Sequence, residues 1–194
     1  NVVIIGLGVA GLAALKTAFG MGADVTVLDT KVEKLQFAQD TYQGRVKTLN
    51  STAAHLEREL KNADLVVGAV LVPGAKAPKV ITREMVQTMK LGAVFIDISI
   101  DQGGCSETSR VTSLSAPTYL EENVLHYCVP NMPAQSPRTS TMALTAATLP
   151  YVKLIADNGF TKAIEVSPSL KAGVNIHQGY ARNKAVADVF GLEY

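Results

Sequence analysis

The sequence predicts an α/β protein: a doubly wound parallel sheet, the Rossmann arrangement, followed by a helical C-terminal segment. Short apolar runs alternate with segments of helical periodicity over residues 1–138. A glycine-rich turn joins the first apolar run to the first helical segment. From Thr139 to Tyr194 the alternation stops and only helical patterns remain. We therefore expect a sheet domain over residues 1–138 and a separate segment over residues 139–194.

The first thirty residues contain a dinucleotide-binding fingerprint. The apolar run Val2–Ile5 leads into a turn with three glycines, a helical segment over Leu12–Phe19 and a second strand, Val25–Asp29. The first glycine permits a tight turn, the second lets the backbone approach a pyrophosphate, and the third lets the helix pack closely on the strand. The N-terminus of the helix offers N–H groups to the phosphates. The expected phosphate-binding residues are Gly6, Gly8, Val9, Ala10 and Gly11.

The acidic residue that ends the second strand predicts the cofactor. Asp29 stands where a carboxylate can accept hydrogen bonds from the ribose hydroxyls of an adenosine. Lys34 follows five residues later; it is either an exposed helix lysine or a cation that would favour a 2′-phosphate. Because a carboxylate at ribose distance repels that phosphate, the sequence predicts NAD.

The later elements follow from apolar runs, periodicity and turn residues. The expected strands cover residues 45–49, 63–70, 93–98 and 124–129. The expected helices cover residues 32–40, 53–61 with Ser51 as N-cap, and 83–89 with Thr82 as N-cap. Residues 139–157 predict a long helix that opens at Pro137, closes at Asn158-Gly159 and is kinked or broken at Pro150. Residues 160–194 predict a helical tail without strands, which packs on a part absent from this chain or folds back on the sheet.

Composition limits the class of protein. Hydrophobic residues make up 47% of the 194, enough for a buried core. A net charge of +1 and the absence of Trp favour neither nucleic acid nor an anionic membrane as partner, and no apolar stretch reaches membrane-spanning length. Cys105 and Cys128 indicate reduced thiols in a cytoplasmic protein. The chain begins at Asn1 with its first strand under way, so we expect it to be part of a longer protein.

Three blocks of the sequence resemble bacterial L-alanine dehydrogenases. They are the glycine turn at residues 6–11, residues 68–78, and residues 96–105 together with residues 129–134. The similarity covers essentially the whole chain and is most specific at Asp101-Gln102-Gly103-Gly104-Cys105 and Asn131-Met132-Pro133. A looser similarity exists to the first domain of proton-translocating transhydrogenases.

The resemblance implies NAD-dependent, reversible oxidative deamination of L-alanine to pyruvate and ammonium by a cytoplasmic homohexamer. It also implies a substrate domain before Asn1 that is completed by the segment from Thr139 onward. The substrate-binding and catalytic lysine, arginine and histidine of the family lie in that preceding part. We therefore expect no alanine turnover by this chain alone, no metal ligands, and no catalytic role for His55, His126 or His177.

Asp101 is the expected catalytic residue. It follows the fifth strand, beyond the carboxyl end at which ligands bind in open parallel sheets. The sharp turn at Gln102-Gly103-Gly104 lets the carboxylate face the nicotinamide, where it could orient the attacking water and help to move protons. By resemblance it lies near the nicotinamide ribose and the substrate. The alternative is a loop aspartate bonded to its own backbone.

Other residues are expected to contact the cofactor or to be structural. Asp97 is expected to face a neighbouring strand or helix end, and Cys105 to be structural, since hydride transfer needs no thiol. Asn131 and Met132 stand near the nicotinamide by resemblance, although Pro130 and Pro133 also make them a turn. The further expected cofactor contacts are Val70, Leu71 and Ile98 at strand ends, Ser51 on the adenine side and, by resemblance, Lys34 near the adenosine.

Two alternative functions remain open at this point. One is the NAD(H)-binding domain of a proton-translocating transhydrogenase, against which the intact Asp-Gln-Gly-Gly-Cys turn speaks. The other is a non-catalytic NAD-sensing module whose tail docks on a partner.

Overall fold

The computed structural model describes residues 1–194, which form two compact units. The first unit comprises Asn1–Val72 and Lys76–Pro130, and the second comprises Pro73–Ala75 and Asn131–Tyr194. The main part of the second unit thus begins at Asn131, eight residues before the predicted boundary at residue 139.

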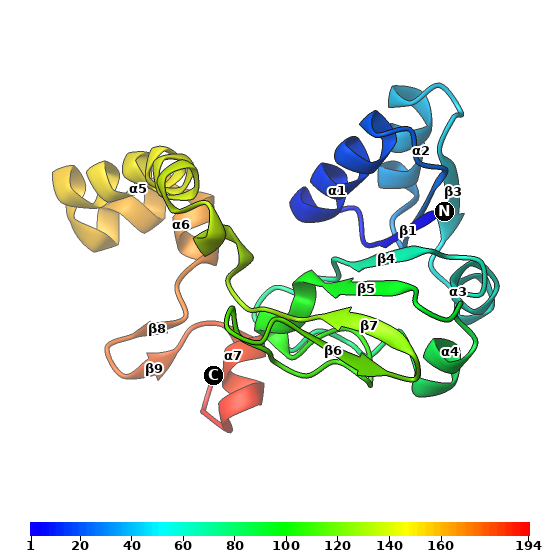
Figure 1. The fold of residues 1–194 in the computed structure, drawn as a ribbon. Helices are drawn as coiled ribbons and strands as arrows, with labels where there is room; N and C mark the ends of the chain where they lie inside the picture. Colours follow the sequence, from blue (N-terminus) through cyan, green and yellow to red (C-terminus); the bar gives the residue numbers. More distant parts are fainter. The chain divides into compact units, whose positions relative to one another are not determined.

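The first unit is built on a seven-stranded sheet with the order β3-β2-β1-β4-β5-β7-β6 (Figure 1). The strands are β1 (Val2–Ile5), β2 (Val25–Asp29), β3 (Lys47–Asn50), β4 (Leu65–Gly68), β5 (Val94–Asp97), β6 (Thr118–Glu121) and β7 (Val124–Tyr127). All neighbours pair in parallel except β6, which is antiparallel to β7. Because β1 lies between β2 and β4, the strand order reverses there, as in a doubly wound sheet. The predicted fold class is confirmed.

Helices cover both faces of this sheet. The helices are α1 (Val9–Gly20), α2 (Val32–Thr41), α3 (Ala53–Leu60), α4 (Arg83–Gln87) and the short 3₁₀ helix η1 (Ile98–Gln102). On one face, Ile4 and Val27 pack with Leu15 of α1 and Leu35 of α2. On the other, the core includes residues of α3, α4 and the remaining strand positions. Alternate side chains of β1 point to opposite faces of the sheet. Because helices cover both faces, all four residues of β1 are buried.

Two expectations for the first unit need correction. The N-cap of α3 is Thr52 and not Ser51, because the Thr52 hydroxyl accepts the His55 N–H at 3.3 Å. Strand β6 was not expected at all. It forms a hairpin with β7 through Glu122 and Asn123, whose φ values are +52° and +61°. Two-residue hairpin turns usually contain a glycine, by which they can be recognised in a sequence, and this turn contains none.

The second unit contains a long helix and a small hairpin. Its elements are the 3₁₀ helix η2 (Met132–Gln135), α5 (Pro137–Val166), α6 (Pro168–Ala172), β8 (Ile176–His177), β9 (Tyr180–Ala181) and α7 (Lys184–Phe190). Helix α5 opens at Pro137 as predicted and continues through Pro150; its non-helical residue is Gly159, with φ +72°. The expectation of a tail without strands was wrong, because Gln178-Gly179 turns the chain between β8 and β9.

None of the helices, α5 included, combines the length and apolarity needed to cross a membrane.

The end of β4 packs very closely against the loop that follows β5. A Cβ atom added to Gly68 would lie far inside van der Waals contact with the Sγ of Cys105 and 3.3 Å from the ring of Phe95. Cys105 is fully buried, which agrees with its expected structural role. Burial and the charge of Asp97 raise the pKa of its thiol well above the usual value, so the thiol stays protonated.

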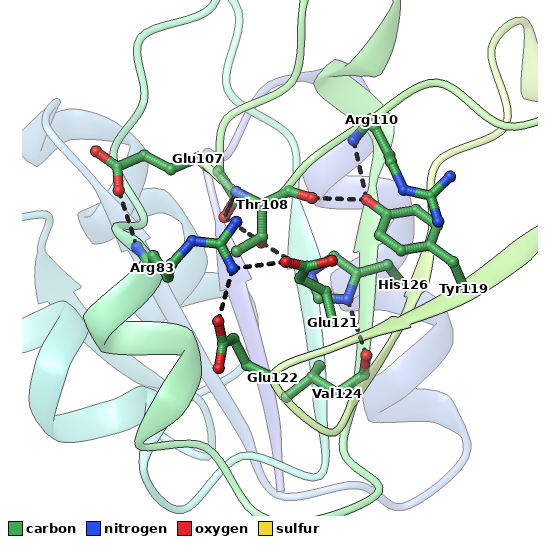
Figure 2. A network of polar contacts seen from close by, with 10 residues as sticks. Arg83, Glu107, Thr108, Arg110, Tyr119, Glu121, Glu122, Val124 and His126 are labelled. Atoms are coloured by element: carbon green, nitrogen blue, oxygen red, sulfur yellow. Dashed lines mark hydrogen bonds and ion pairs between the residues drawn. The ribbon is translucent and has the colours of Figure 1, made fainter.

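A buried histidine lies on β7, within the β6–β7 hairpin (Figure 2). The Nδ1 of His126 lies 2.9 Å from the carbonyl oxygen of Val124, and its Nε2 lies 2.8 Å from the hydroxyl of Thr108. Tyr119 stacks on the imidazole ring and donates its own hydroxyl to the Thr108 carbonyl. Both ring nitrogens therefore have partners inside the core. Burial lowers the pKa of His126, which is a structural residue as expected.

We expect Gly68→Ala to lower the free energy of unfolding of this chain by about 1–3 kcal/mol, because the added methyl group must displace Cys105. Urea unfolding followed by circular dichroism measures the loss. Adding Cys105→Ala should recover part of it, since the sulfur is then absent. Gly20→Ala is the control, because a Cβ there meets no atom within 4 Å. An unchanged midpoint for Gly68→Ala would contradict this packing.

The free energy of unfolding of this chain should decrease as the pH falls below about 6.5, the usual pKa of histidine. The unfolded chain then binds a proton at His126 that the folded chain, with its lowered pKa, does not bind. The slope from this residue is at most about 1.4 kcal/mol per pH unit. Urea midpoints between about pH 7.5 and pH 5.5 should therefore vary less for His126→Gln than for the unsubstituted chain. The partly exposed His55, replaced by Gln, is the control, and equal pH dependence in all three proteins would refute the assignment.

Candidate functional site

The candidate site lies at the carboxyl edge of the sheet, around the place where the strand order reverses. The register aligns Ile5 with Leu28 on one side and with Gly68 on the other, and Gly68 with Asp97. The loops after β1, β2, β4 and β5 therefore begin at the same edge. This is the edge at which open parallel sheets bind ligands.

The glycine turn after β1 is held by backbone contacts that exclude side chains. Gly6 has a φ of +94°, and a Cβ on it would lie 2.5 Å from the carbonyl oxygen of Ala69. A Cβ on Gly11 would overlap the carbonyl oxygen of Gly6. The Ala69 N–H also donates to the Ile5 carbonyl at 2.8 Å. The turn and the start of α1 are thus fixed directly against the end of β4.

The N-terminus of α1 is open to a ligand. Gly8 is the N-cap of the helix, so no side chain caps the first N–H groups. A Cβ placed on Gly8 would meet no atom within 4 Å. Val9 and Ala10 are exposed, and Val9 is 90% accessible. Uncapped N–H groups beside open space, at the positive end of a helix dipole, fit a pyrophosphate.

Asp29 binds the glycine turn and the start of α2 together. Its Oδ2 accepts the Leu7 N–H at 2.7 Å, and its Oδ1 accepts the Lys31 N–H at 2.9 Å. The Nζ of Lys34 lies 3.3 Å from Oδ2. Burial alone would raise the pKa of Asp29, but these three hydrogen bonds outweigh it and the pKa is lowered. The carboxylate is therefore ionised, and Lys34 is its partner.

Ser51 reaches the same place through its backbone. Its N–H donates to the carbonyl oxygen of Asp29 at 3.0 Å, one residue after the pairing of Asn50 with Asp29. The structure thus brings Ser51, Asp29 and Lys34 together at the end of β2.

The loop after β4 is tied to the loop after β5. The Val70 N–H donates to the hydroxyl of Ser99 at 2.9 Å. Val70 is half-buried and Leu71 is 65% exposed, so Leu71 is the more accessible of the two. Ile98 is half-buried against the core beside α1 and α2. Sequence reasoning missed Ser99, although the Asp97-Ile98-Ser99 spacing is that of an Asx turn.

Asp97 holds the loop after its own strand. Its Oδ1 accepts the Ser99 N–H at 2.9 Å, and its Oδ2 accepts the Cys105 N–H at 2.8 Å and the Ser109 hydroxyl at 2.5 Å. The side chain is fully buried. It caps the N-terminus of η1 and faces the loop that follows, so the expectation that Asp97 faces a helix end is confirmed. Both ends of the segment that carries Asp101 are therefore anchored on one carboxylate.

Asp101 is exposed on η1, and the turn that follows it needs two glycines. Gly103 and Gly104 have φ values of +92° and +78°. Their N–H groups donate to the Ile100 and Ser99 carbonyls at 2.9 and 3.0 Å. This turn follows Asp101, which lies at the carboxyl edge of the sheet, one turn of 3₁₀ helix after the end of β5.

Asn131 and Met132 belong to the second unit. Asn131 has a φ of +49° and is the N-cap of η2, and its carbonyl accepts the Ala134 N–H at 2.9 Å. Its backbone is therefore that of a turn, in keeping with the flanking prolines.

Comparisons with known proteins place the chain in a family. The family model described as "Alanine dehydrogenase/PNT, C-terminal domain" matches residues 1–184. The chain is 53% identical, over its whole length, to "Alanine dehydrogenase" of Halomonas elongata and covers 52% of that protein. It is 48% identical to "Alanine dehydrogenase 2" of Staphylococcus aureus, again with 100% of the chain and 52% of the relative covered. The chain thus spans about half the length of the curated relatives it matches.

Solved structures give the same result. A structure titled "L-alanine dehydrogenase" superposes with a TM-score of 0.85 and 44% identity, over 98% of this chain and 52% of that one. A transhydrogenase from Sinorhizobium meliloti superposes with a TM-score of 0.67 and 25% identity, over 95% of this chain and 49% of that one. The resemblance predicted from the sequence blocks is confirmed, and the alanine dehydrogenases are the more similar group.

Proposed function

Because the chain belongs to the alanine dehydrogenase/PNT C-terminal domain family, we propose that it is the NAD(H)-binding part of an alanine dehydrogenase. The overall reaction is the conversion of L-alanine, NAD⁺ and water to pyruvate, ammonium, NADH and a proton. The observation that carries the proposal is the open, uncapped N-terminus of α1, with the ionised carboxylate of Asp29 hydrogen-bonded to the turn that precedes it.

A dehydrogenase family implies a nicotinamide cofactor, and we assign it as NAD. Gly8, Val9 and Ala10 would offer backbone N–H groups to the pyrophosphate. Asp29 would accept hydrogen bonds from the adenosine ribose. Lys34 is already paired with Asp29, so its charge is not free to attract a 2′-phosphate, which the carboxylate would repel. The other assigned contacts are Gly6, Gly11, Ser51, Val70, Leu71, Ile98, Asp101, Asn131 and Met132.

Asp101 is assigned as the acid–base group of the reaction. When bound, the cofactor supplies the hydride acceptor for the Cα of alanine. The Asp101 carboxylate would then orient the water that attacks the resulting imine and accept its proton. The exposure of Asp101 at the carboxyl edge supports this role, and the anchoring of its loop on Asp97 would limit its motion. Groups that bind the amino acid would come from the remainder of the enzyme.

The setting follows from the same assignment. The partners are the small molecules L-alanine and pyruvate and further copies of the enzyme in a homohexamer, and the location is the cytoplasm. A transhydrogenase domain is the less favoured function, because identity to the transhydrogenase is 25%, against 44–53% to alanine dehydrogenases. A non-catalytic NAD sensor would not need the exposed Asp101 turn.

We expect this chain to bind NADH more tightly than NADPH, because Asp29 accepts ribose hydroxyls and repels a 2′-phosphate. Asp29→Asn should narrow the preference by no more than about 1–3 kcal/mol. Isothermal titration calorimetry with both cofactors measures it. Asp24→Asn is the matched control, since Asp24 precedes β2 and lies at its opposite end. Equal or tighter binding of NADPH by the unsubstituted chain would overturn the assignment.

In the complete enzyme, Asp101→Asn should lower kcat by roughly 10²–10⁴-fold while NADH binding is retained. Asn keeps the size of the side chain but loses the charge and the ability to take a proton. Steady-state kinetics and NADH fluorescence titration separate the two effects, with Asp24→Asn again as control. Turnover equal to that of the unsubstituted enzyme, or loss of NADH binding in step with activity, would exclude a catalytic role.

A further inference from the structure

We propose that Lys79 is a positioning residue that holds the turn carrying Asp101 in its active geometry. The inference rests on the proposed catalytic role of Asp101. Neither the fingerprint nor the family blocks give Lys79 a role, and its contacts are with residues 24 and 27 positions further along the chain.

The turn after Asp101 is made of two consecutive glycines. Gly103 and Gly104 both adopt positive φ, which glycine enters about as readily as negative φ. A side chain on Gly104 is excluded, because its Cβ would lie 2.7 Å from both Asp97 and Ser109. Gly104 is therefore needed for close packing and Gly103 for its positive φ, and hydrogen bonds to the turn must restrict the rotation of both residues.

Residues 77–81 run beside this turn and bind it through backbone hydrogen bonds. The Ala77 N–H donates to the Gln102 carbonyl and the Val80 N–H to the Cys105 carbonyl, each at 2.9 Å. The Glu107 N–H donates back to the Ile81 carbonyl at 3.0 Å. These hydrogen bonds hold the residues before and after the two glycines, Gln102 and Cys105. They do not involve the carbonyl oxygen of Gly103.

Lys79 supplies the missing contact. Its Nζ donates to the Gly103 carbonyl at 2.6 Å and to the Ser106 carbonyl at 2.9 Å. One of these carbonyl groups precedes Gly104 and the other follows it, so a single ammonium group connects the two ends of the glycine turn. Hydrogen bonds from a charged donor are shorter and stronger than neutral ones. The bridge therefore restricts the backbone that follows Asp101.

The effect of removing this bridge should fall on catalysis rather than on cofactor binding. Lys79 touches neither the α1 N-terminus nor Asp29, and the backbone contacts of residues 77–81 keep the loop folded. What changes is the precision with which the Asp101 carboxylate is held. A small misplacement of a reacting group can cost about a hundredfold in rate.

The experiment uses the complete enzyme with Lys79→Met and Lys79→Arg. We expect Lys79→Met to lower kcat roughly 10–100-fold, with the Kd for NADH essentially unchanged. Lys79→Arg should restore part of the rate, because a guanidinium can also donate to two carbonyls. Lys61→Met, which removes an exposed lysine before β4, should have no effect. Unchanged kcat for Lys79→Met, or loss of NADH binding in both Lys79 variants, would overturn the proposal.

A double variant separates this inference from the proposed function. If Lys79 acts through Asp101, adding Lys79→Met to Asp101→Asn should cause little further loss of kcat. Multiplying losses would show that Lys79 acts elsewhere and would overturn the inference. Turnover by Asp101→Asn at the level of the unsubstituted enzyme would instead refute the proposed role of Asp101 itself.

Discussion

The close approach of the first glycine turn to the end of β4 is the constraint on which the site depends. Gly6 lies against the Ala69 carbonyl, and Gly11 lies against the carbonyl of Gly6, with no space for a side chain at either place. Strand, turn and helix are therefore in backbone contact. This contact determines where α1 begins, and hence where its free N–H groups face. A larger residue at Gly11 would separate the helix from the sheet and move the N-terminus of α1, where we propose that the pyrophosphate binds.

The same use of a carboxylate recurs at two strand ends. Asp29 ends β2 and Asp97 ends β5, and each is buried and accepts N–H groups from the loop that follows it. Asp29 differs in that Lys34 and a ribose would share its remaining lone pairs. Asp97 has a hydroxyl and two N–H groups around it and serves the loop alone. The two aspartates occupy equivalent positions at strand ends, so it is the groups around each carboxylate that distinguish the proposed ribose-binding role of Asp29 from the structural role of Asp97.

Local signals in the sequence were enough to predict every strand of the large sheet except β6, whereas contacts between distant residues could not be predicted from it. Apolar runs and the glycine spacing predicted β1, α1 and β2, because these elements are encoded within about thirty residues. The sequence did not show whether Ser51 or Thr52 is the N-cap of α3. Both residues carry a hydroxyl group, and only the backbone conformation determines which of them caps the helix. The β6–β7 hairpin was not predicted, because Glu122 and Asn123 adopt positive φ values in a turn that contains no glycine. The bridge from Lys79 to Gly103 depends on how two loops pack, which no periodicity reports.

The single antiparallel pair in the large sheet has a consequence for how the first unit folds. Strands β6 and β7 are joined by two residues, and hairpins of this kind form in about 1–10 µs. Every parallel pair requires a crossover first, and the pair β1–β4 joins residues about sixty positions apart. The chain must therefore close its longest loop to bring Ala69 against Gly6. Because the entropy cost of closing a loop grows with its length, the approach of Ala69 to Gly6 carries the largest such cost in this sheet, although Gly6 is among the first residues to be synthesised.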